Sequence, residues 1–558
     1  MKSPLQTRAE LAAAMQAALG EKFQREIPQV DVLPSRNLSF GDLACSSAMP
    51  LAGILKRNPR EIAKVMAEAI SSNFSQVEKI SVDGPGFLNI TLSGAYLAEF
   101  TAAAASGGIS QFIPADGKGR TALVEFVSSN PTGPLTVGHC RQAVLGDAVS
   151  RLLEAVGWTV QREYYFNDSG RQMEKLAESL AARYLNLPGG SMEIPDGGYQ
   201  GEYIKSWAED LRKDKGDSLE WPEHKDLFRD YAGNRAFVLI SDDLKLLGIT
   251  FDRYFAESEL IPDAVEAAID LLEEKELIYK DSDDKRKLWL KLSEMGRPDD
   301  RVIKREDGTY TYRMPDIAYH LDKFKRNYDL IVDIFGSDHI DTCKDVETVL
   351  GVLLGKDRVS SSLRIILHQF VTLVRGGEKV KMSTRAGNFV TLRDLVNEVG
   401  SADVVRYLFL TRRAEAHMDF DLEVAGAEND ENPVFYVQYA FARIAGILRK
   451  TTDMNTLLVS DPAILLSLLT GERERDLMRL LETMPLRISA AATALEPHRI
   501  PDLLAEVARA FHGFYQHHRV VDPENDQLTA ARLTLCMAVR SILNDMLTIL
   551  GVRAPEKM

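Results

Sequence analysis

The segment from Thr121 to Phe166 constrains the fold of this chain more than any other. It opens with the short apolar run ALVEFV, continues through SSNPTGPLTVGH and a helical pattern that ends at Gly157, and closes with the alternating run WTVQREYYF. Because a helix separates the two runs, they are expected to lie side by side as parallel strands. Further strand-like runs follow at Leu330–Phe335 and Leu363–Leu373. The chain is therefore predicted to contain a parallel α/β sheet.

A region with a different hydrophobic pattern precedes the predicted sheet. Helical patterns at Ala9–Phe23 and Pro59–Phe74, and alternating runs within Val77–Leu92, predict a small N-terminal α+β domain over residues 1–112. The stretch Ala102–Gly119 is rich in Ala, Gly and Ser and then becomes polar, so we expect a linker there.

The rest of the chain divides into two further predicted domains. Residues 113–428 contain the parallel sheet, with an insertion of charged helices and loops at about residues 186–300. Residues 429–558 place apolar side chains three and four positions apart, with Gly or Pro between the segments, which is typical of an all-α helical bundle. Residues 441–558 contain 14 Lys and Arg against 14 Asp and Glu. This balance suits a polyanionic partner, and an ordinary solvated bundle explains it equally well.

Composition excludes several classes of protein. The 558 residues are 45% hydrophobic and 27% charged, unlike a disordered or collagen-like chain, and the net charge of −15 excludes a polycation that coats nucleic acid indiscriminately. No apolar run approaches the roughly 18–20 residues of a membrane span, and the N-terminus lacks the pattern of a signal peptide. Four cysteines without metal-ligand spacing predict no structural zinc and a reducing, cytoplasmic location: Cys45, Cys140, Cys343 and Cys536.

The segment Asn130–His139, with the sequence NPTGPLTVGH, carries the first chemical signal. Gly138 allows an anionic ligand to approach the backbone, and the helix that begins near His139 points free N–H groups toward it, which favours phosphate. An imidazole at this point can donate to phosphoryl oxygens. Taken alone, a capped turn with an incidental histidine explains the segment better.

Two other segments carry weaker signals. Gly376–Asn388 (GGEKVKMSTRAGN) is a glycine-rich loop with three basic side chains, which can close over a triphosphate. Tyr310–His320 (YTYRMPDIAYH) places an aspartate and tyrosines before a predicted strand, where they can bind a cationic ligand. Taken alone, a solvated basic hairpin explains the first segment better, and an N-cap with a core tyrosine explains the second.

Together these segments are more informative, because they occur with many others in one order. The chain contains PTGPLTVGH, RQAVLGD, EYYFNDSGRQ, TYRMPDIAYHLDKF, KMSTRAGNFVTL and NPVFYVQYAFARI, and in all of them it resembles class I arginyl-tRNA synthetase. Weaker matches reach both ends, with FGD, KRNP and GPGFLN early in the chain and EPH, FHGFY and LGVRAPE late in it. The resemblance implies a Rossmann-type catalytic domain with an insertion, an N-terminal domain that touches the outer corner of tRNA, and a helical C-terminal domain that binds the anticodon stem and loop.

The activity implied by the resemblance is ATP-dependent ligation of L-arginine to tRNA(Arg). Arginine and ATP would form arginyl-adenylate and pyrophosphate, and the arginyl group would then pass to the 2′-hydroxyl of the terminal adenosine with release of AMP. Members of this family usually need bound tRNA before activation proceeds. We therefore expect ATP with Mg²⁺ as the substrate complex, tRNA(Arg) and L-arginine as partners, no membrane association, and a monomer.

The resemblance also implies the residues of the site. Catalysis is expected to use His139, Lys381, Thr136 and Arg385, which would position and stabilise the phosphates. The ATP site is expected to contain Pro131, Gly133, Pro134, Gly138, His139, Lys381, Met382 and Ser383. The arginine site is expected to contain Asp316, Tyr312, Glu257, Asn130, Glu125 and His339. A fixed carboxylate suits a planar guanidinium, and a lysine would leave part of that carboxylate unpaired.

Three details of the site stay open. Glu125 holds the amino or carboxylate group of the substrate, or it only satisfies backbone groups at a strand end. The family signature His-x-Gly-His has Thr136 in place of its first histidine, and a hydroxyl cannot carry positive charge. The signature Lys-Met-Ser-Lys-Ser reads KMSTR, so its second lysine is displaced.

Two other functions compete with an active ligase. A catalytically idle tRNA-binding paralogue would explain Thr136 and Thr384, but such a chain is expected to lose the pocket acids Asp316 and Glu257 as well. A small-molecule nucleotidyltransferase with a similar histidine motif would need neither the N-terminal domain nor the helical bundle.

Overall fold

The computed structural model describes residues 2–35, 38–71, 73–168, 170–187, 189, 191–282, 286–380, 390–451 and 461–558. Contacts between Cα atoms divide the chain into two compact units. We call Gly117–Ala427 the central unit, and Met1–Asp116 with Glu428–Met558 the terminal unit. None of the helices in the described ranges combines the length and the apolarity that crossing a membrane requires.

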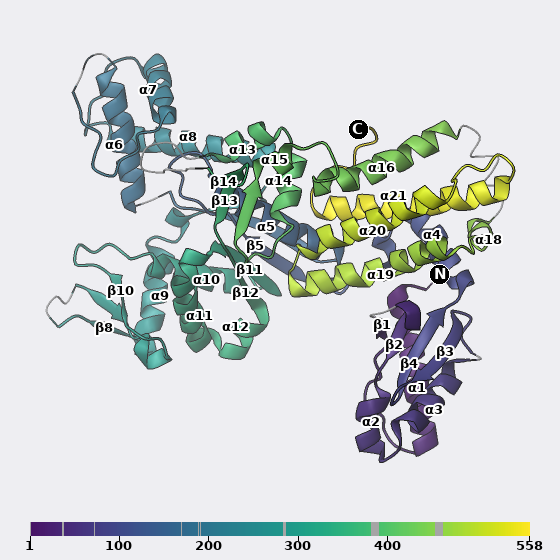
Figure 1. Cartoon of the computed structure of the whole chain (residues 1–558). Coiled ribbons are helices and arrows are strands. Elements are labelled where there is room, and N and C mark those ends of the chain that lie inside the picture. The colour runs from purple at the N-terminus through teal and green to yellow at the C-terminus, as the bar shows by residue number, and fades with distance from the viewer. Residues whose placement is uncertain are drawn as a thin grey trace. The chain divides into compact units, whose positions relative to one another are not determined.

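The central unit is built on a parallel sheet of five strands (Figure 1). Its strand order is β12–β11–β5–β6–β7, and every neighbouring pair is parallel. The chain runs outward from β5 to β7 and resumes on the other side of β5 with β11, so the strand order reverses there. The predicted Rossmann-type sheet is confirmed. Its strands are β5 (Thr121–Glu125), β6 (Thr159–Phe166), β7 (Arg253–Ala256), β11 (Leu330–Gly336) and β12 (Leu363–His368).

Helices connect these strands. α5 (Val137–Ala155) joins β5 to β6, and the chain turns after it at Gly157, whose φ of 90° favours glycine. α10 (Arg313–Lys325) leads into β11, and α11 (Ile340–Leu354) and α12 (Lys356–Ser362) lead to β12. Apolar side chains of α10 and α11 pack with those of β5 and β11 in one apolar core of the unit.

The interval from residue 186 to 300 contains more than charged helices and loops. α6 (Gly170–Asn186), α7 (Glu202–Lys215) and α8 (Lys225–Leu246) enclose an apolar cluster of their own. β7 then joins the main sheet beside β6, and α9 (Asp263–Glu274) follows it. A small antiparallel sheet comes next, formed by β8 (Ile278–Lys280), β9 (Leu288–Leu290) and β10 (Arg301–Lys304).

The last part of the central unit follows β12. Its described residues form a second small sheet in the order β14–β13–β15 and three short helices. The elements are β13 (Val371–Arg375), β14 (Glu378–Lys379), α13 (Leu392–Val399), α14 (Ala402–Phe409), β15 (Met418–Asp421) and α15 (Leu422–Gly426).

The terminal unit contains an α+β part and a helical bundle, as predicted. The first part has an antiparallel sheet in the order β1–β2–β4–β3. Its elements are α1 (Pro4–Phe23), β1 (Leu33–Pro34), β2 (Leu43–Cys45), α2 (Ala48–Leu55), α3 (Pro59–Ser71), β3 (Val77–Asp83) and β4 (Phe87–Leu92). The bundle contains α16 (Pro433–Lys450), α18 (Pro462–Leu466), α19 (Glu472–Ala494), α20 (Arg499–His517) and α21 (Asp526–Ile549).

The predicted linker at Ala102–Gly119 is wrong. Its first part belongs to α4 (Gly94–Gly107), which packs against α18 and α21 of the bundle. Alanine has the highest helix propensity of all residues, and Phe100 and Ala104 are fully buried. The small residues therefore form a close-packing helix surface instead of a flexible connection.

A buried ion pair joins the two parts of the terminal unit. The Arg8 guanidinium on α1 lies 2.8 Å from the Glu482 carboxylate on α19, with exposed side-chain fractions of only 5% and 2%. The Tyr96 hydroxyl donates to the other oxygen of Glu482 at 3.1 Å. Because a buried charge without its partner is costly, each part of the unit depends on the other for this contact.

Candidate functional site

Several of the predicted site residues lie where strands of the sheet end and the strand order reverses. Glu125 ends β5, and the loop after it carries Asn130 and reaches Thr136 at the start of α5. His339 follows β11, and Asp316 lies in the first turn of α10. Since α10 runs antiparallel to the strand it precedes, its first turn lies at the same edge of the sheet. This edge is where open α/β sheets bind ligands.

The turn after β5 has an uncommon backbone conformation. Val127 has a φ of 70° and Ser128 a φ of 40°, in the left-handed region that a β-branched residue rarely adopts. The Ser128 hydroxyl donates to Glu125 at 2.8 Å and accepts the Tyr165 N–H at 3.1 Å. Such strain persists only where surrounding contacts impose it, and it concentrates at functional sites.

His139 lies in the first turn of α5, directly beside Thr136. Its Nδ1 accepts the backbone N–H of Thr136 at 3.2 Å, so the proton of the neutral ring is on Nε2. Burial lowers the pKa of His139 to about 4, and the imidazole is therefore uncharged at neutral pH. His139 offers an anionic ligand a hydrogen-bond donor without positive charge.

The residues before His139 are tied to two other helices. The Leu135 N–H donates to Asp243 on α8 at 3.4 Å, and the Leu135 carbonyl accepts the Leu392 N–H of α13 at 2.8 Å. Thr136 forms a β-bridge with Thr391, which comes shortly after the KMSTRAGNF segment. The chain therefore leaves that segment beside the His139 loop. Four predicted residues lie outside the described residues: Lys381, Met382, Ser383 and Arg385.

Two neighbouring carboxylates act on Asp316 at this edge. Burial raises the pKa of Asp316 to about 7, and the neighbouring carboxylates of Glu125 and Glu257 act in the same direction. His320 and Lys323 oppose this rise. Glu257 is only 9% exposed. Such a concentration of buried negative charge suits a cationic ligand, because a cation relieves the repulsion between the carboxylates.

Glu125 contacts two side chains in this structure. It is 2% exposed, pairs with the Lys323 ammonium group and accepts the hydrogen bond from Ser128. Its carboxylate therefore does more than satisfy backbone groups at the end of β5.

The other predicted arginine and ATP residues differ in exposure. Tyr312 is 63% exposed and the His339 side chain 58% exposed, so both lie largely in solvent. Pro131 is buried, whereas Asn130 and Pro134 are half-buried. Asn130, Pro131 and Pro134 are thus packed within the loop between β5 and α5. The side chains of Tyr312 and His339 are much less packed by the rest of the protein.

The two predicted glycines have different surroundings. A Cβ atom on Gly133 would lie 2.7 Å from the Tyr203 hydroxyl oxygen, so this glycine allows α7 to pack closely. A Cβ atom on Gly138 would meet only Thr136 Oγ1, at 3.7 Å. Open space at the start of α5 fits the approach of a ligand to its backbone, as the sequence predicted for Gly138.

The sequence analysis missed several residues around Asp316, Glu257 and Glu125. The Tyr165 hydroxyl donates to Glu257 at 2.9 Å. His320 and Lys323 oppose the rise in the pKa of Asp316, and they lie four and seven positions after it on α10. This helical spacing places all three on one face, and it was a signal that the sequence already contained.

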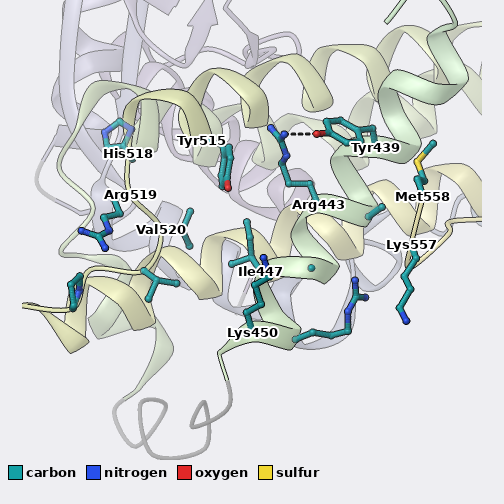
Figure 2. Close-up of a pocket in the computed structure, with 15 residues that line it drawn as sticks. Tyr439, Arg443, Ile447, Lys450, Tyr515, His518, Arg519, Val520, Lys557 and Met558 are labelled. Carbon is teal, nitrogen blue, oxygen red and sulfur yellow. Dashed lines mark hydrogen bonds between the residues drawn. The ribbon is translucent and has the colours of Figure 1, made fainter. Parts of the chain in front are cut away.

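A second candidate site lies in the terminal unit (Figure 2). It is a cavity of about 820 Å³ formed by α16, the end of α20 and the segment after it, and the last residues of the chain. None of its described lining residues is acidic, although the whole chain has a net charge of −15. Its basic side chains are Arg443, Arg449, Lys450, Arg519 and Lys557.

Two tyrosines contribute aromatic surface to this cavity (Figure 2). The Arg443 guanidinium lies 4.6 Å from the ring centroid of Tyr439 and 4.9 Å from that of Tyr515, and it donates to the Tyr439 hydroxyl. Aromatic rings and guanidinium planes are the surfaces on which unpaired bases stack. The cavity therefore has the chemistry of a site for single-stranded nucleic acid.

Comparisons with known families cover almost the whole chain. The family described as tRNA synthetases class I (R), catalytic domain, matches residues 106–406, which is more than half of the chain. The chain belongs to the arginyl-tRNA synthetase family. The arginyl tRNA synthetase N terminal domain matches residues 6–92, and the DALR anticodon binding domain matches residues 437–558. The second candidate site lies within this last match.

Individual arginyl-tRNA synthetases match from end to end. The arginine–tRNA ligase of Desulfotalea psychrophila is 43% identical over 524 residues, which cover 93% of each chain. The arginine–tRNA ligase of Thermotoga maritima is 40% identical over 555 residues, which cover 99% of each chain. The Thermus thermophilus arginyl-tRNA synthetase structure has a TM-score of 0.75 at 21% identity, over 99% of this chain and 100% of that one, and supports the fold. The chain is thus an enzyme of this family, which ligates arginine to tRNA at the expense of ATP.

Proposed function

We propose that arginine is activated at the carboxyl edge of the central sheet and that the terminal unit binds the tRNA. The observation that carries this proposal is the convergence of Asp316, Glu257 and Glu125 at the edge where α5 presents His139. One side of the site thus suits a cation and the other suits phosphate.

The arginine side chain binds through the carboxylates of Asp316 and Glu257. Each is placed by a different element, so a planar guanidinium can donate to both at once. Asn130, Glu125 and His339 hold the α-amino and carboxylate groups, and Tyr312 packs beside the guanidinium. The burial of Glu257 and the half-buried position of Asp316 support this assignment, because charge-assisted hydrogen bonds are stronger away from water.

The ATP phosphates bind where α5 begins, with Pro131, Gly133, Pro134 and Gly138 forming the loop around them. A carboxylate oxygen of arginine attacks the α-phosphorus, the bond from that phosphorus to the bridging oxygen breaks, and pyrophosphate leaves. The Nε2–H of His139 donates to the phosphoryl oxygens of the transition state. Because His139 is neutral, positive charge must come from other groups. We assign this role to Lys381 and Arg385, with Thr136 as a hydrogen-bonding neighbour and with Met382 and Ser383 beside the nucleotide.

The tRNA binds through both parts of the terminal unit. The 2′-hydroxyl of its terminal adenosine attacks the carbonyl carbon of arginyl-adenylate, and AMP leaves. Residues 429–558 bind the anticodon, with Tyr439 and Tyr515 stacking on bases and the basic side chains of the cavity contacting phosphates. Residues 1–112 contact the outer corner of the tRNA, and residues 113–428 form the catalytic domain.

Several properties extend this proposal. Mg²⁺ accompanies ATP, activation waits for bound tRNA, and the enzyme works as a cytoplasmic monomer without structural zinc. All four cysteines are buried free thiols in this structure, which accords with a reducing compartment.

The experiment is ATP–pyrophosphate exchange with and without arginine, and with and without an unfractionated tRNA pool. We expect exchange only when arginine and tRNA are both present. Exchange at the same rate with and without tRNA would contradict tRNA-dependent activation and favour a small-molecule nucleotidyltransferase. Folded protein that binds tRNA and shows no exchange would favour an idle paralogue, with Thr136 the first residue to examine.

A further inference from the structure

α10 carries three polar side chains on one face. Asp316, His320 and Lys323 are four and three positions apart, and this face turns toward β5 and β11. His320 is 6% exposed and Lys323 is fully buried. Charged and titratable groups are rarely buried to this extent without a partner, so their partners define what they do.

Lys323 neutralises two carboxylates of the sheet. Glu125 and Asp333 are direct register partners on β5 and β11, where two like charges would repel each other. The Lys323 ammonium lies 2.6 Å from Asp333 and also pairs with Glu125. Although burial alone would raise it, Lys323 and His320 together lower the pKa of Asp333 to about 2. Asp333 is therefore an ionised hydrogen-bond acceptor.

Both ring nitrogens of His320 face acceptors. Nε2 lies 2.9 Å from the Asp333 carboxylate, and Nδ1 lies 2.7 Å from the backbone carbonyl oxygen of Asp316. Neither partner has a proton to donate, so hydrogen bonds from both nitrogens require the imidazolium form of the ring. The contrast with His139 is direct, because Nδ1 of that ring accepts an N–H group.

The charges around His320 then balance in a defined way. Lys323 pairs with both Glu125 and Asp333, and His320 lies beside Asp333, so these two cationic side chains offset the charges of the two carboxylates. The groups that act electrostatically on Asp316 are His320, Lys323, Glu125 and Glu257. Cys343 on α11 also faces Asp333 and Asp316, and burial raises its pKa to about 12, so the thiol is neutral.

We propose that His320 is a positioning residue of the arginine site, held as an imidazolium between Asp333 and the Asp316 backbone, where its charge favours the ionised form of the Asp316 carboxylate that accepts the guanidinium group. This inference rests on the proposed role of Asp316. It assigns to His320 a role in the protonation state of the pocket as well as in its packing.

The test is the affinity for arginine between pH 6 and pH 9 in the full-length enzyme and in His320→Gln, measured by calorimetry. Glutamine keeps a donor of similar reach and removes the charge. We expect the pH midpoint of arginine binding to move upward by about one unit, with several-fold weaker binding at pH 7 and near-equal binding at pH 9. The control His417→Gln changes an exposed histidine of the same unit and should leave the profile unchanged.

An unchanged profile in His320→Gln would overturn the inference, and so would an equal loss of arginine and ATP affinity with a lower Tm, because that pattern describes a structural role. Neutron diffraction of wild-type crystals at pH 7 provides a second measurement that needs no variant. It should show hydrogen on both ring nitrogens of His320, and a single hydrogen there would refute the proposal. If Asp316→Asn leaves the affinity for arginine unaltered, that result contradicts the proposed arginine site itself, whatever the result for His320.

Discussion

The Nδ1 atom of His139 lies 3.2 Å from the backbone nitrogen of Thr136 and accepts its proton. One contact thereby fixes the tautomer of the imidazole and closes the first turn of α5. Since burial also keeps the ring neutral, this end of the helix offers an anionic ligand hydrogen-bond donors and a dipole, but no charged imidazole. The positive charge that pyrophosphate formation requires must come from side chains elsewhere.

His139→Ala should lower kcat for arginine activation by roughly a hundredfold, because one donor to the transition state is lost. The KM for arginine should stay within about threefold, since the guanidinium site is separate. Steady-state exchange kinetics check both values, with His417→Ala as the matched control. A normal kcat with a raised arginine KM would contradict the phosphate role.

Stability should fall on acidification because His139 and His368 are neutral in the folded protein. Burial lowers the pKa of each to about 4, whereas the unfolded chain takes up these protons near the ordinary value of about 6.5. Their contribution to stability is therefore present above about pH 6.5 and is lost as the pH falls toward 4, by at most about 1.4 kcal/mol per pH unit for each histidine. Urea unfolding at several pH values should show a shallower decline in His368→Gln. An identical decline in that variant would exclude His368 as a cause.

Asp316→Asn should make the enzyme more stable and less active. The folded state holds the Asp316 proton up to about pH 7, the unfolded state releases it near 3.8, and stability is therefore lost as the pH rises through this window. Asparagine removes this penalty, so Tm at pH 8 should rise. The arginine KM should increase by about ten- to a hundredfold for each charge-assisted hydrogen bond that is lost. A lower Tm at pH 8 would show that the carboxylate stabilises the fold.

Breaking the Arg8–Glu482 pair should destabilise the terminal unit strongly. Glu482→Ala leaves the Arg8 charge buried and unpaired, at a cost of about 3–5 kcal/mol. Glu10→Ala removes the exposed Lys2–Glu10 pair and should cost less than about 1 kcal/mol. Denaturant unfolding compares the two variants. The double variant Arg8→Met with Glu482→Leu should recover much of the loss, and equal costs for the two single variants would refute this account.

Tyr515→Ala should weaken tRNA binding by about 1–3 kcal/mol if the ring stacks on a base. Filter binding with the tRNA pool measures this loss, and arginine affinity should stay the same. Tyr279→Ala removes a partly exposed tyrosine of the central unit and provides the control. Equal tRNA affinity in both variants would remove Tyr515 from the proposed anticodon site.

Long periodic segments of this chain could be predicted from sequence, and short or composition-biased ones could not. β5, α5 and β6 follow from an apolar run, a helical pattern and a second run in close succession. β7 was missed because its four residues, RYFA, are too few to show a period. α4 was misjudged because an alanine-rich helix and a small-residue linker have similar compositions, and only the burial of Phe100 and Ala104 separates them.

The residues of the site likewise divide into those that could be predicted from sequence and those that could not. His139, Asp316 and Glu257 were predicted because the segments that contain them resemble those of the family. The roles of His320 and Lys323 depend on Glu125 and Asp333, and Lys323 is 198 residues from Glu125 along the chain. No local pattern shows which strand end a helix face will cover.

Arg8 and Glu482 are 474 residues apart, and this separation has a consequence for synthesis. At the usual 5–20 residues per second, a ribosome takes roughly 25–95 seconds to travel between them. The contiguous residues of the central unit can fold during this time, whereas Arg8 stays without its carboxylate until α19 has emerged. A chain that is released before α19 has been made can therefore contain a folded central sheet while Arg8 on α1 has no Glu482 to pair with. Such a truncated product lacks a contact of the first helix that the complete enzyme has.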